Sequence, residues 1–136
     1  MQPLLHRLKA SGITVTERPG NGLLRVGDAT LALSDGRLAS QRAREDGLSN
    51  LLLVDLALDY TSAARIAISK AADTTAQAQD QAIALLRQAG FSVSEVADLP
   101  GLVVLRTVAT LANEAADAVL QGVGSAADID IAMRAG

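Results

Sequence analysis

Residues 50–58, Asn-Leu-Leu-Leu-Val-Asp-Leu-Ala-Leu, form an unbroken apolar run of strand length. A strand has this composition when its sheet is covered on both faces, whereas a half-exposed strand alternates apolar and polar residues. We therefore expect residues 50–58 to be the central strand of an α/β sheet with helices packed against it.

The chain before this run predicts a short helix, three strands and a surface helix. The expected elements are, in order, a helix on the Leu4, Leu5 and Leu8 stripe that stops at Gly12, strands at 13–18, 23–26 and 29–34, and a helix at 37–46. Gly20 and Gly22 give a dense turn signal, so we expect a hairpin between the first two strands. They do not make a dinucleotide fingerprint, which needs a glycine turn that opens a helix.

The chain after the run continues to alternate. Residues 61–70 are locally ambiguous, because alanine favours a helix whereas the Ile-Ala-Ile pattern favours a strand. Thr74 and Gln77 form a capping-box pattern for a helix that ends at Gly90. A strand pattern follows at 91–96, and an amphipathic helix is expected over about 101–121.

The chain ends shortly after a further helix start. Ser125-Ala-Ala-Asp128 is a capping box, and the helix that it opens reaches only to Gly136. A helix this short has little to pack against, so the pattern predicts a segment of a longer protein.

Composition argues against several classes of function. The 136 residues carry a net charge of −3 without a basic cluster, and Tyr60 and Phe91 are the only aromatic residues, so nucleic-acid binding is not expected. The absence of cysteine excludes disulfides and thiolate chemistry, which is consistent with a cytoplasmic protein. The N-terminal helix is too short and too charged for a signal sequence or a membrane span.

Side chains suited to chemistry are few and isolated. His6 lies beside Arg7 and Lys9 without a neighbour that could activate it. The carboxylate pairs lack a third ligand or a calcium loop, and the serines lack an adjacent base; these residues are Asp55, Asp59, Asp128, Asp130, Ser34, Ser40 and Ser62. We expect no catalytic residue and no metal site.

Residues 98–136 carry a more specific signal. They resemble the start of the C-terminal helical domain of NAD-dependent 3-hydroxyacyl-CoA dehydrogenases, whose signature runs PGF(I/V)xNR, then an NEA or MEA step, then (S/T)xxDIDxAM(K/R)xG. The positions in register are Pro100, Gly101, Arg106, Glu114, Ala115, Gly122, Ser125, Asp128, Ile129, Asp130, Ala132, Met133 and Gly136. The asparagine that helps to hold substrate in the family is replaced by Leu105.

The resemblance extends upstream, where the order of elements matches the end of the family's NAD-binding domain and favours a strand for 61–70. Counted back without gaps, the family's catalytic His falls on Leu56 and its partner Glu on Ile68. The substrate-side Ser falls near Gly36 or Arg37. The resemblance therefore implies a copy of the catalytic unit that has lost the His, Glu, Ser and Asn of hydride transfer.

The resemblance also implies an architecture. The expected fold is a truncated Rossmann-like α/β sheet with flanking helices over residues 1–98. The first helices of a truncated domain like the C-terminal domain of 6-phosphogluconate dehydrogenase would follow over 99–136. Long bacterial members of the family carry a second, divergent copy of this kind.

The implied function is that of a non-catalytic segment of an oxidoreductase of fatty-acid or aromatic-acid acyl-CoA breakdown, which supports dimerisation and substrate-side packing. The segment would bind no cofactor; NAD belongs to the parent enzyme, whose catalytic NAD-binding domain and acyl-CoA are the expected partners. The substrate-side or interface candidates lie on the polar side of the 101–121 helix and are Arg106, Thr110, Asn113, Glu114 and Asp117.

Two other readings remain open. The chain is alternatively a stand-alone acyl-CoA-binding or assembly module without turnover, which predicts exposed apolar surface on the 101–121 helix. It is otherwise a Rossmann-like binder of a small molecule near Ser34, Asp35 and Asp59, at the carboxyl ends of the strands.

Overall fold

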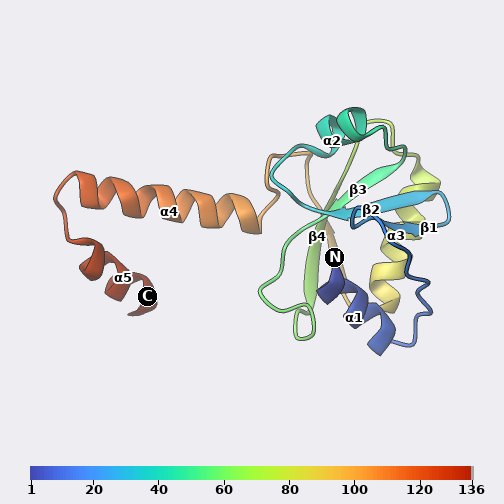
Figure 1. Ribbon diagram of the computed structural model, residues 1–136, viewed down its shortest axis with the longest axis horizontal. Coiled ribbons are helices and arrows are strands. Elements are labelled where there is room, and N and C mark those ends of the chain that lie inside the picture. Colours follow the sequence, from blue (N-terminus) through green and yellow to red (C-terminus); the bar gives the residue numbers. More distant parts are fainter. Residues whose placement is uncertain (136) are drawn as a thin grey trace. The chain divides into compact units, whose positions relative to one another are not determined.

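The computed structural model describes residues 1–135 and contains a five-stranded sheet with helices (Figure 1). The strands are β1 (Leu24–Val26), β2 (Ala29–Leu33), β3 (Leu51–Val54), β4 (Arg65–Lys70) and β5 (Ser92–Glu95). The helices are α1 (Gln2–Ala10), α2 (Ala39–Asp46), α3 (Ala76–Gln88), α4 (Val104–Leu120) and α5 (Ala126–Ala135). The chain divides into two compact units, Met1–Leu105 and Arg106–Gly136, and each is described by itself.

The sheet has the strand order β1-β2-β3-β4-β5, so the central strand lies in the apolar run at residues 50–58, but it covers only Leu51–Val54 and ends before Asp55. β2 pairs in parallel with β3, and β4 with β5, whereas the β1–β2 and β3–β4 pairs are antiparallel. This mixed sheet with flanking helices confirms the Rossmann-like α/β class. The ambiguous residues 65–70 are a strand, as the resemblance implied.

Successive side chains of β3 point to opposite faces of the sheet, and each face has its own core cluster. Leu52 and Val54 belong to a cluster that includes the buried residues of α1 and α3, and those two helices lie side by side in Figure 1. Leu51 and Leu53 belong to a second cluster with α2 and Leu102. Both faces of β3 are therefore covered, which is the reason for its continuous apolar sequence.

The segment before β1 differs from the expectation. Residues 13–18 are not a strand, and Gly20 and Gly22 do not form a hairpin. The hairpin connects β1 and β2 instead, through Gly27 and Asp28. Gly27 has a φ of 53°, which favours glycine, and a Cβ there would also displace the end of the Gln81 side chain at 2.5 Å.

The start of α3 also corrects the sequence analysis by one residue. The N-cap is Thr75, whose hydroxyl accepts a hydrogen bond from the Ala78 N–H. Thr74 is buried and donates its hydroxyl hydrogen to the Leu51 carbonyl at 3.0 Å. The capping-box pattern favoured Thr74 because Gln77 lies three residues further on, but the Gln77 side chain donates to the Asp28 carboxylate instead.

The second unit contains most of α4 together with α5. Ser125 and Asp128 form the expected capping box: the Ser125 hydroxyl accepts from the Asp128 N–H, and the Asp128 carboxylate accepts from the Ser125 N–H. No residue of α4 or of the described part of α5 is buried. No helix within residues 1–135 is long and apolar enough to cross a membrane.

Candidate functional site

The carboxyl end of β3 is occupied by a buried carboxylate. Asp55 directly follows the strand and is 2% exposed. Its oxygens accept hydrogen bonds from the Leu56 N–H at 2.8 Å and from the Val103 and Val104 N–H groups at 3.1 Å each. Asp55 thus caps the first turn of α4 from 49 positions away. These hydrogen bonds satisfy the buried carboxylate entirely with backbone donors.

A second carboxylate, Asp98, lies in the connection between β5 and α4. Asp98 accepts from the Ala39 N–H at 2.6 Å and from the Ser40 N–H at 2.9 Å, and so caps α2. The N-cap residue of α2 is Leu38, which has no side chain able to cap the helix itself. The sequence analysis missed this role of Asp98, because nothing in a linear pattern indicates a cap supplied by a residue 59 positions away.

The connection between these two anchors has a constrained backbone. Gly101 and Leu102 both have positive φ, 72° and 52° respectively, although such angles are unfavourable for leucine. Leu102 is nevertheless 2% exposed and packs in the α2 cluster. Burial of its side chain and the Asp55 hydrogen bonds stabilise the turn at residues 101–104.

The positions matched to the family's catalytic residues are apolar in the structure. Leu56 is half-buried just after β3. Ile68 lies opposite Val54 in the β3–β4 pair and is 2% exposed. Leu105 contacts the position of Gly36: a Cβ on that glycine would lie 3.7 Å from the leucine Cδ2. None of the three side chains can transfer a proton.

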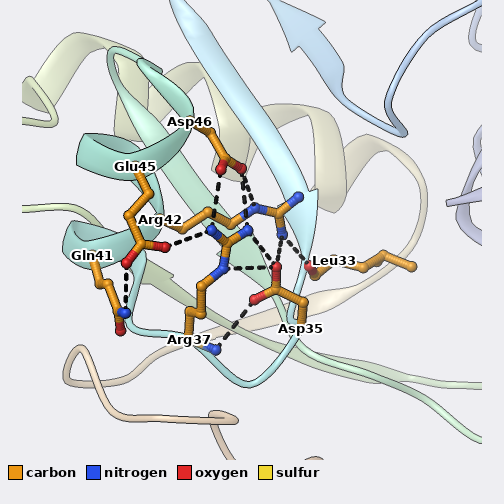
Figure 2. A network of polar contacts seen from close by, with 7 residues as sticks. All are labelled: Leu33, Asp35, Arg37, Gln41, Arg42, Glu45 and Asp46. Atoms are coloured by element: carbon orange, nitrogen blue, oxygen red, sulfur yellow. Dashed lines mark hydrogen bonds and ion pairs between the residues drawn. The ribbon is translucent and has the colours of Figure 1, made fainter.

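Figure 2 shows what surrounds the position matched to the substrate-side serine. The Arg37 guanidinium is bound by Asp35 at 2.7 Å, by Glu45 at 2.8 Å and by Asp46 at 3.1 Å. Arg42 donates to the Leu33 carbonyl at 2.8 Å and lies 3.4 Å from Asp35. The network ties the end of β2 to α2 and uses the donors of Arg37 within the protein.

The positive charge of Arg37 stabilises the ionised form of the three carboxylates around it. The hydrogen bond from Arg37 lowers the pKa of Asp35, with smaller contributions from the nearby cations and against a small opposing effect of burial. The same arginine lowers the pKa values of Glu45 and Asp46. All three carboxylates therefore stay ionised well below neutral pH.

The other polar candidates show only local contacts. Asp59 accepts from Thr61 and Ser62, and these hydrogen bonds lower its pKa to about 2. His6 is exposed on α1. The Ser34 hydroxyl at the end of β2 is buried without a hydrogen-bond partner among the described residues. Within residues 1–135, no group of three His, Cys, Asp or Glu residues could hold a metal ion.

The interface candidates share one helix. Arg106, Thr110, Asn113, Glu114 and Asp117 are all exposed on α4. The apolar residues Val108, Leu111 and Val119 are also exposed on this helix, by 54%, 46% and 39%. Helical spacing places the two groups on different sides of α4.

A dinucleotide does not fit the residues of this unit. Its phosphates need a glycine turn between a strand and a helix whose N–H groups face them. Gly27 instead joins two antiparallel strands and is closed by Gln81, and no helix begins after Gly20 and Gly22. Gly36 lies between β2 and α2, but α2 receives the Asp98 carboxylate at its N-terminus.

Comparison with known proteins identifies the class. Residues 31–100 match the family model of the reduced Rossmann-fold domain of 3-hydroxybutyryl-CoA dehydrogenase. The chain is 36% identical over 120 residues to 3-hydroxyadipyl-CoA dehydrogenase from Escherichia coli, covering 88% of this chain and 24% of that protein. The fold is therefore the Rossmann-like unit of the 3-hydroxyacyl-CoA dehydrogenases. The chain belongs to the 3-hydroxyacyl-CoA dehydrogenase family.

Solved structures agree with this assignment. The crystal structure of 3-hydroxybutyryl-CoA dehydrogenase from Escherichia coli K12 matches with a TM-score of 0.67 and 34% identity, over 87% of this chain and 24% of that one. The (S)-3-hydroxybutyryl-CoA dehydrogenase from Ralstonia eutropha shares the fold at a TM-score of 0.60 and 19% identity, over 72% and 35% of the two chains. The chain spans about a quarter of the length of its Escherichia coli relatives.

Proposed function

We propose that this chain is a non-catalytic segment of an NAD-dependent 3-hydroxyacyl-CoA dehydrogenase, a degenerate second copy that contributes dimerisation and substrate-side packing. The observation that carries the proposal is the apolar character of Leu56, Ile68 and Leu105 at the positions matched to the catalytic His, its Glu and the substrate-side Asn. A side chain without a titratable group can neither take a proton from a 3-hydroxyl nor orient an imidazole.

The exposed apolar side of α4 supports the assembly part of the proposal. Val108, Leu111 and Val119 are too exposed for a helix whose apolar stripe is covered by its own domain. Because the relatives are about four times as long as this chain, the proposed occupant of this side is the helical domain of the catalytic copy. The parent protein would be a homodimer located in the cytoplasm.

The polar side of α4 would then form part of the substrate wall. Arg106 would offer a guanidinium to a CoA phosphate, and the polar groups of Thr110 and Asn113 could form hydrogen bonds to the ligand. We propose that the segment itself binds no NAD, which the catalytic domain of the parent would hold. The pathway would be fatty-acid or aromatic-acid acyl-CoA breakdown.

The first test is calorimetric titration of the chain with acetoacetyl-CoA and, separately, with NADH. We expect acetoacetyl-CoA to bind and NADH not to bind. Arg106→Gln should weaken CoA-ester binding, whereas Arg134→Gln, which removes an exposed arginine from α5, should not. Tight NADH binding would contradict the assignment of a non-catalytic copy.

The second test concerns assembly. When the catalytic copy is absent, the uncovered apolar side should cause the chain to associate with itself in light scattering after gel filtration. Leu111→Glu should weaken this association because the charge falls on the apolar side of α4. Gln121→Glu adds the same charge on the opposite side of the helical pattern and should leave association unchanged. Equal effects of the two variants would exclude the apolar side as the interface.

A specific observation keeps a second candidate function open. The unpartnered, buried hydroxyl of Ser34 lies at the carboxyl end of β2, where Rossmann-like sheets bind their ligands. The chain would then be a stand-alone acyl-CoA or small-molecule binding module without turnover. A monomeric chain whose ligand affinity depends on Ser34 rather than on Arg106 would favour this alternative.

A further inference from the structure

A cavity of about 1130 Å³ lies in the N-terminal part of the first unit. Its walls come from α1, the irregular segment 13–23, β1 and the end of α2, with Leu5, Leu8 and Leu24 among its apolar lining. We call it the N-terminal cavity. Most of its lining precedes residues 31–100, the range matched by the family model, so the family assignment does not account for it.

The base of the N-terminal cavity is firmly built. Leu4 and Leu8 of α1 are fully buried in the main core cluster, and Arg7 donates a hydrogen bond to the Ala89 carbonyl at 2.8 Å. Ile13 and Val15 also pack against this cluster. The segment opposite β1 is therefore held at a fixed distance from the sheet, although it forms no strand with it.

The backbone that lines the cavity has free hydrogen-bonding groups. Among the described residues, the N–H and C=O groups of residues 14–22 form no hydrogen bond with the rest of the chain. Residues 14–22 are exposed apart from the half-buried Val15, so water can bind these groups, and those that line the cavity are available to a ligand. Several free N–H donors on one wall favour a ligand that carries acceptor oxygens.

The charges at the cavity are not balanced. Of its two acidic residues, Glu17 is paired with Lys9, and Asp46 is bound by Arg37 and Arg42. Arg18 and Arg25 also line the cavity, and the guanidinium of neither forms an ion pair or hydrogen bond in the part of the chain that the structure describes. The cavity therefore presents two uncompensated guanidinium groups above an apolar base.

We propose that the N-terminal cavity binds an amphipathic anion, with its apolar body on Leu5, Leu8 and Leu24 and its carboxylate or phosphate between Arg18 and Arg25. The volume is large enough for a small molecule, and pockets that combine an apolar lining with a few polar groups are the usual form of such sites. Guanidinium groups bind both oxyanions through paired N–H donors. The site is separate from α4 and independent of the function proposed above.

The test is an NMR titration of the full 136-residue chain with decanoate below its micelle concentration, with affinity measured by calorimetry. Decyl phosphate distinguishes a phosphate ester from a carboxylate as the preferred head group. Decanol and inorganic phosphate test the charge and the apolar body separately. The double variant Arg18→Gln with Arg25→Gln removes the cations, and Arg87→Gln removes an exposed arginine of α3 that does not line the cavity.

We expect amide shifts confined to the cavity lining and at least ~10-fold weaker binding by the double variant, with no change for Arg87→Gln. Decanol or inorganic phosphate should each bind more weakly than decanoate. No saturable shift with either amphiphile, or equal affinity of the double variant, would overturn the proposal, as would shifts confined to α4. Hydrogen-exchange protection of residues 14–18 by an extended peptide, without a response to decanoate, would assign the cavity to a peptide strand instead. Because the double variant leaves α4 intact, failure here leaves the acetoacetyl-CoA test unaffected.

Discussion

Replacement of Asp55 by alanine should destabilise the first unit severely for a single substitution. The carboxylate is 2% exposed and accepts from the N–H groups of Leu56, Val103 and Val104. A hydrogen bond to a charged acceptor contributes about 1.5–3 kcal/mol, and loss of a helix cap costs about 0.5–2 kcal/mol. These contributions overlap, and water can reach the half-exposed first turn of α4, so we expect a loss of about 2–3 kcal/mol.

Such a loss is a large part of the 5–15 kcal/mol that typically stabilises a domain. For a unit of this size, it should lower Tm by roughly 10–20 °C. The assay is urea unfolding followed by far-ultraviolet circular dichroism, with thermal unfolding as a second measurement. The ellipticity of the native state should also fall slightly, because the start of α4 loses its cap.

Two further variants make the test of Asp55 specific. Asp55→Asn keeps the shape and one acceptor oxygen, so it should cost about 1 kcal/mol, less than alanine. Asp73→Ala removes an exposed carboxylate without a hydrogen-bond partner in residues 1–135 and should change stability by less than about 0.5 kcal/mol. If Asp55→Ala also stayed within about 0.5 kcal/mol, the proposed anchoring of the connection would be refuted.

Two other predictions concern α3 and the arginine network. Thr75→Ala should lower the free energy of unfolding in urea by about 1 kcal/mol, because the Ala78 N–H loses its cap. Thr75→Ser keeps the hydroxyl and should retain most of this stability. Equal losses in the two variants would argue against capping. The pKa of Asp35 is lowered mainly by its hydrogen bond from Arg37, so its stabilisation is present above the ordinary carboxyl pKa of about 4 and is lost as pH falls through the lower folded value. Arg37→Gln should therefore flatten the fall in urea midpoint between about pH 5 and pH 2, and an unchanged slope would contradict this reasoning.

Where periodicity and burial agree, the sequence predicted the fold well. The run at residues 50–58 identified the central strand because both faces of β3 are covered, and a fully buried strand has no alternative to apolar residues. The Leu4, Leu5 and Leu8 stripe likewise identified α1, because its spacing places all three side chains on the sheet. In both cases the local spacing of apolar residues matches the side chains that the core buries.

The prediction failed where a pattern was compatible with more than one environment. Residues 13–18 alternate because Ile13 and Val15 pack on the core while Thr14 and Thr16 face outward, and this alternation needs no partner strand. A strand requires ladder hydrogen bonds, and β1 is only three residues long. Residues 13–18, which line the N-terminal cavity, thus have the side-chain pattern of a strand but do not pair with a neighbouring strand.

The roles of the two anchoring carboxylates could not be read from the sequence at all. Asp55 and Asp98 reach N–H groups that lie 48 and 59 positions away, and backbone donors leave no signature in residue type. The resemblance aligned the apolar positions in this region but said nothing of how the connection to α4 is held. Only the three-dimensional arrangement shows that the buried polar groups here bind backbone.

Asp55 lies next to the positions from which we propose that the catalytic side chains have been lost. A buried carboxylate is costly to desolvate and is tolerated only when hydrogen bonds satisfy it. At the end of β3, Asp55 accepts three N–H groups, while the neighbouring positions Leu56 and Ile68 are apolar. A unit whose only demand was stability could replace the carboxylate as well and avoid the positive φ of Leu102. The segment before α4 thus combines a buried, fully hydrogen-bonded carboxylate with a strained residue, next to the apolar positions Leu56 and Ile68.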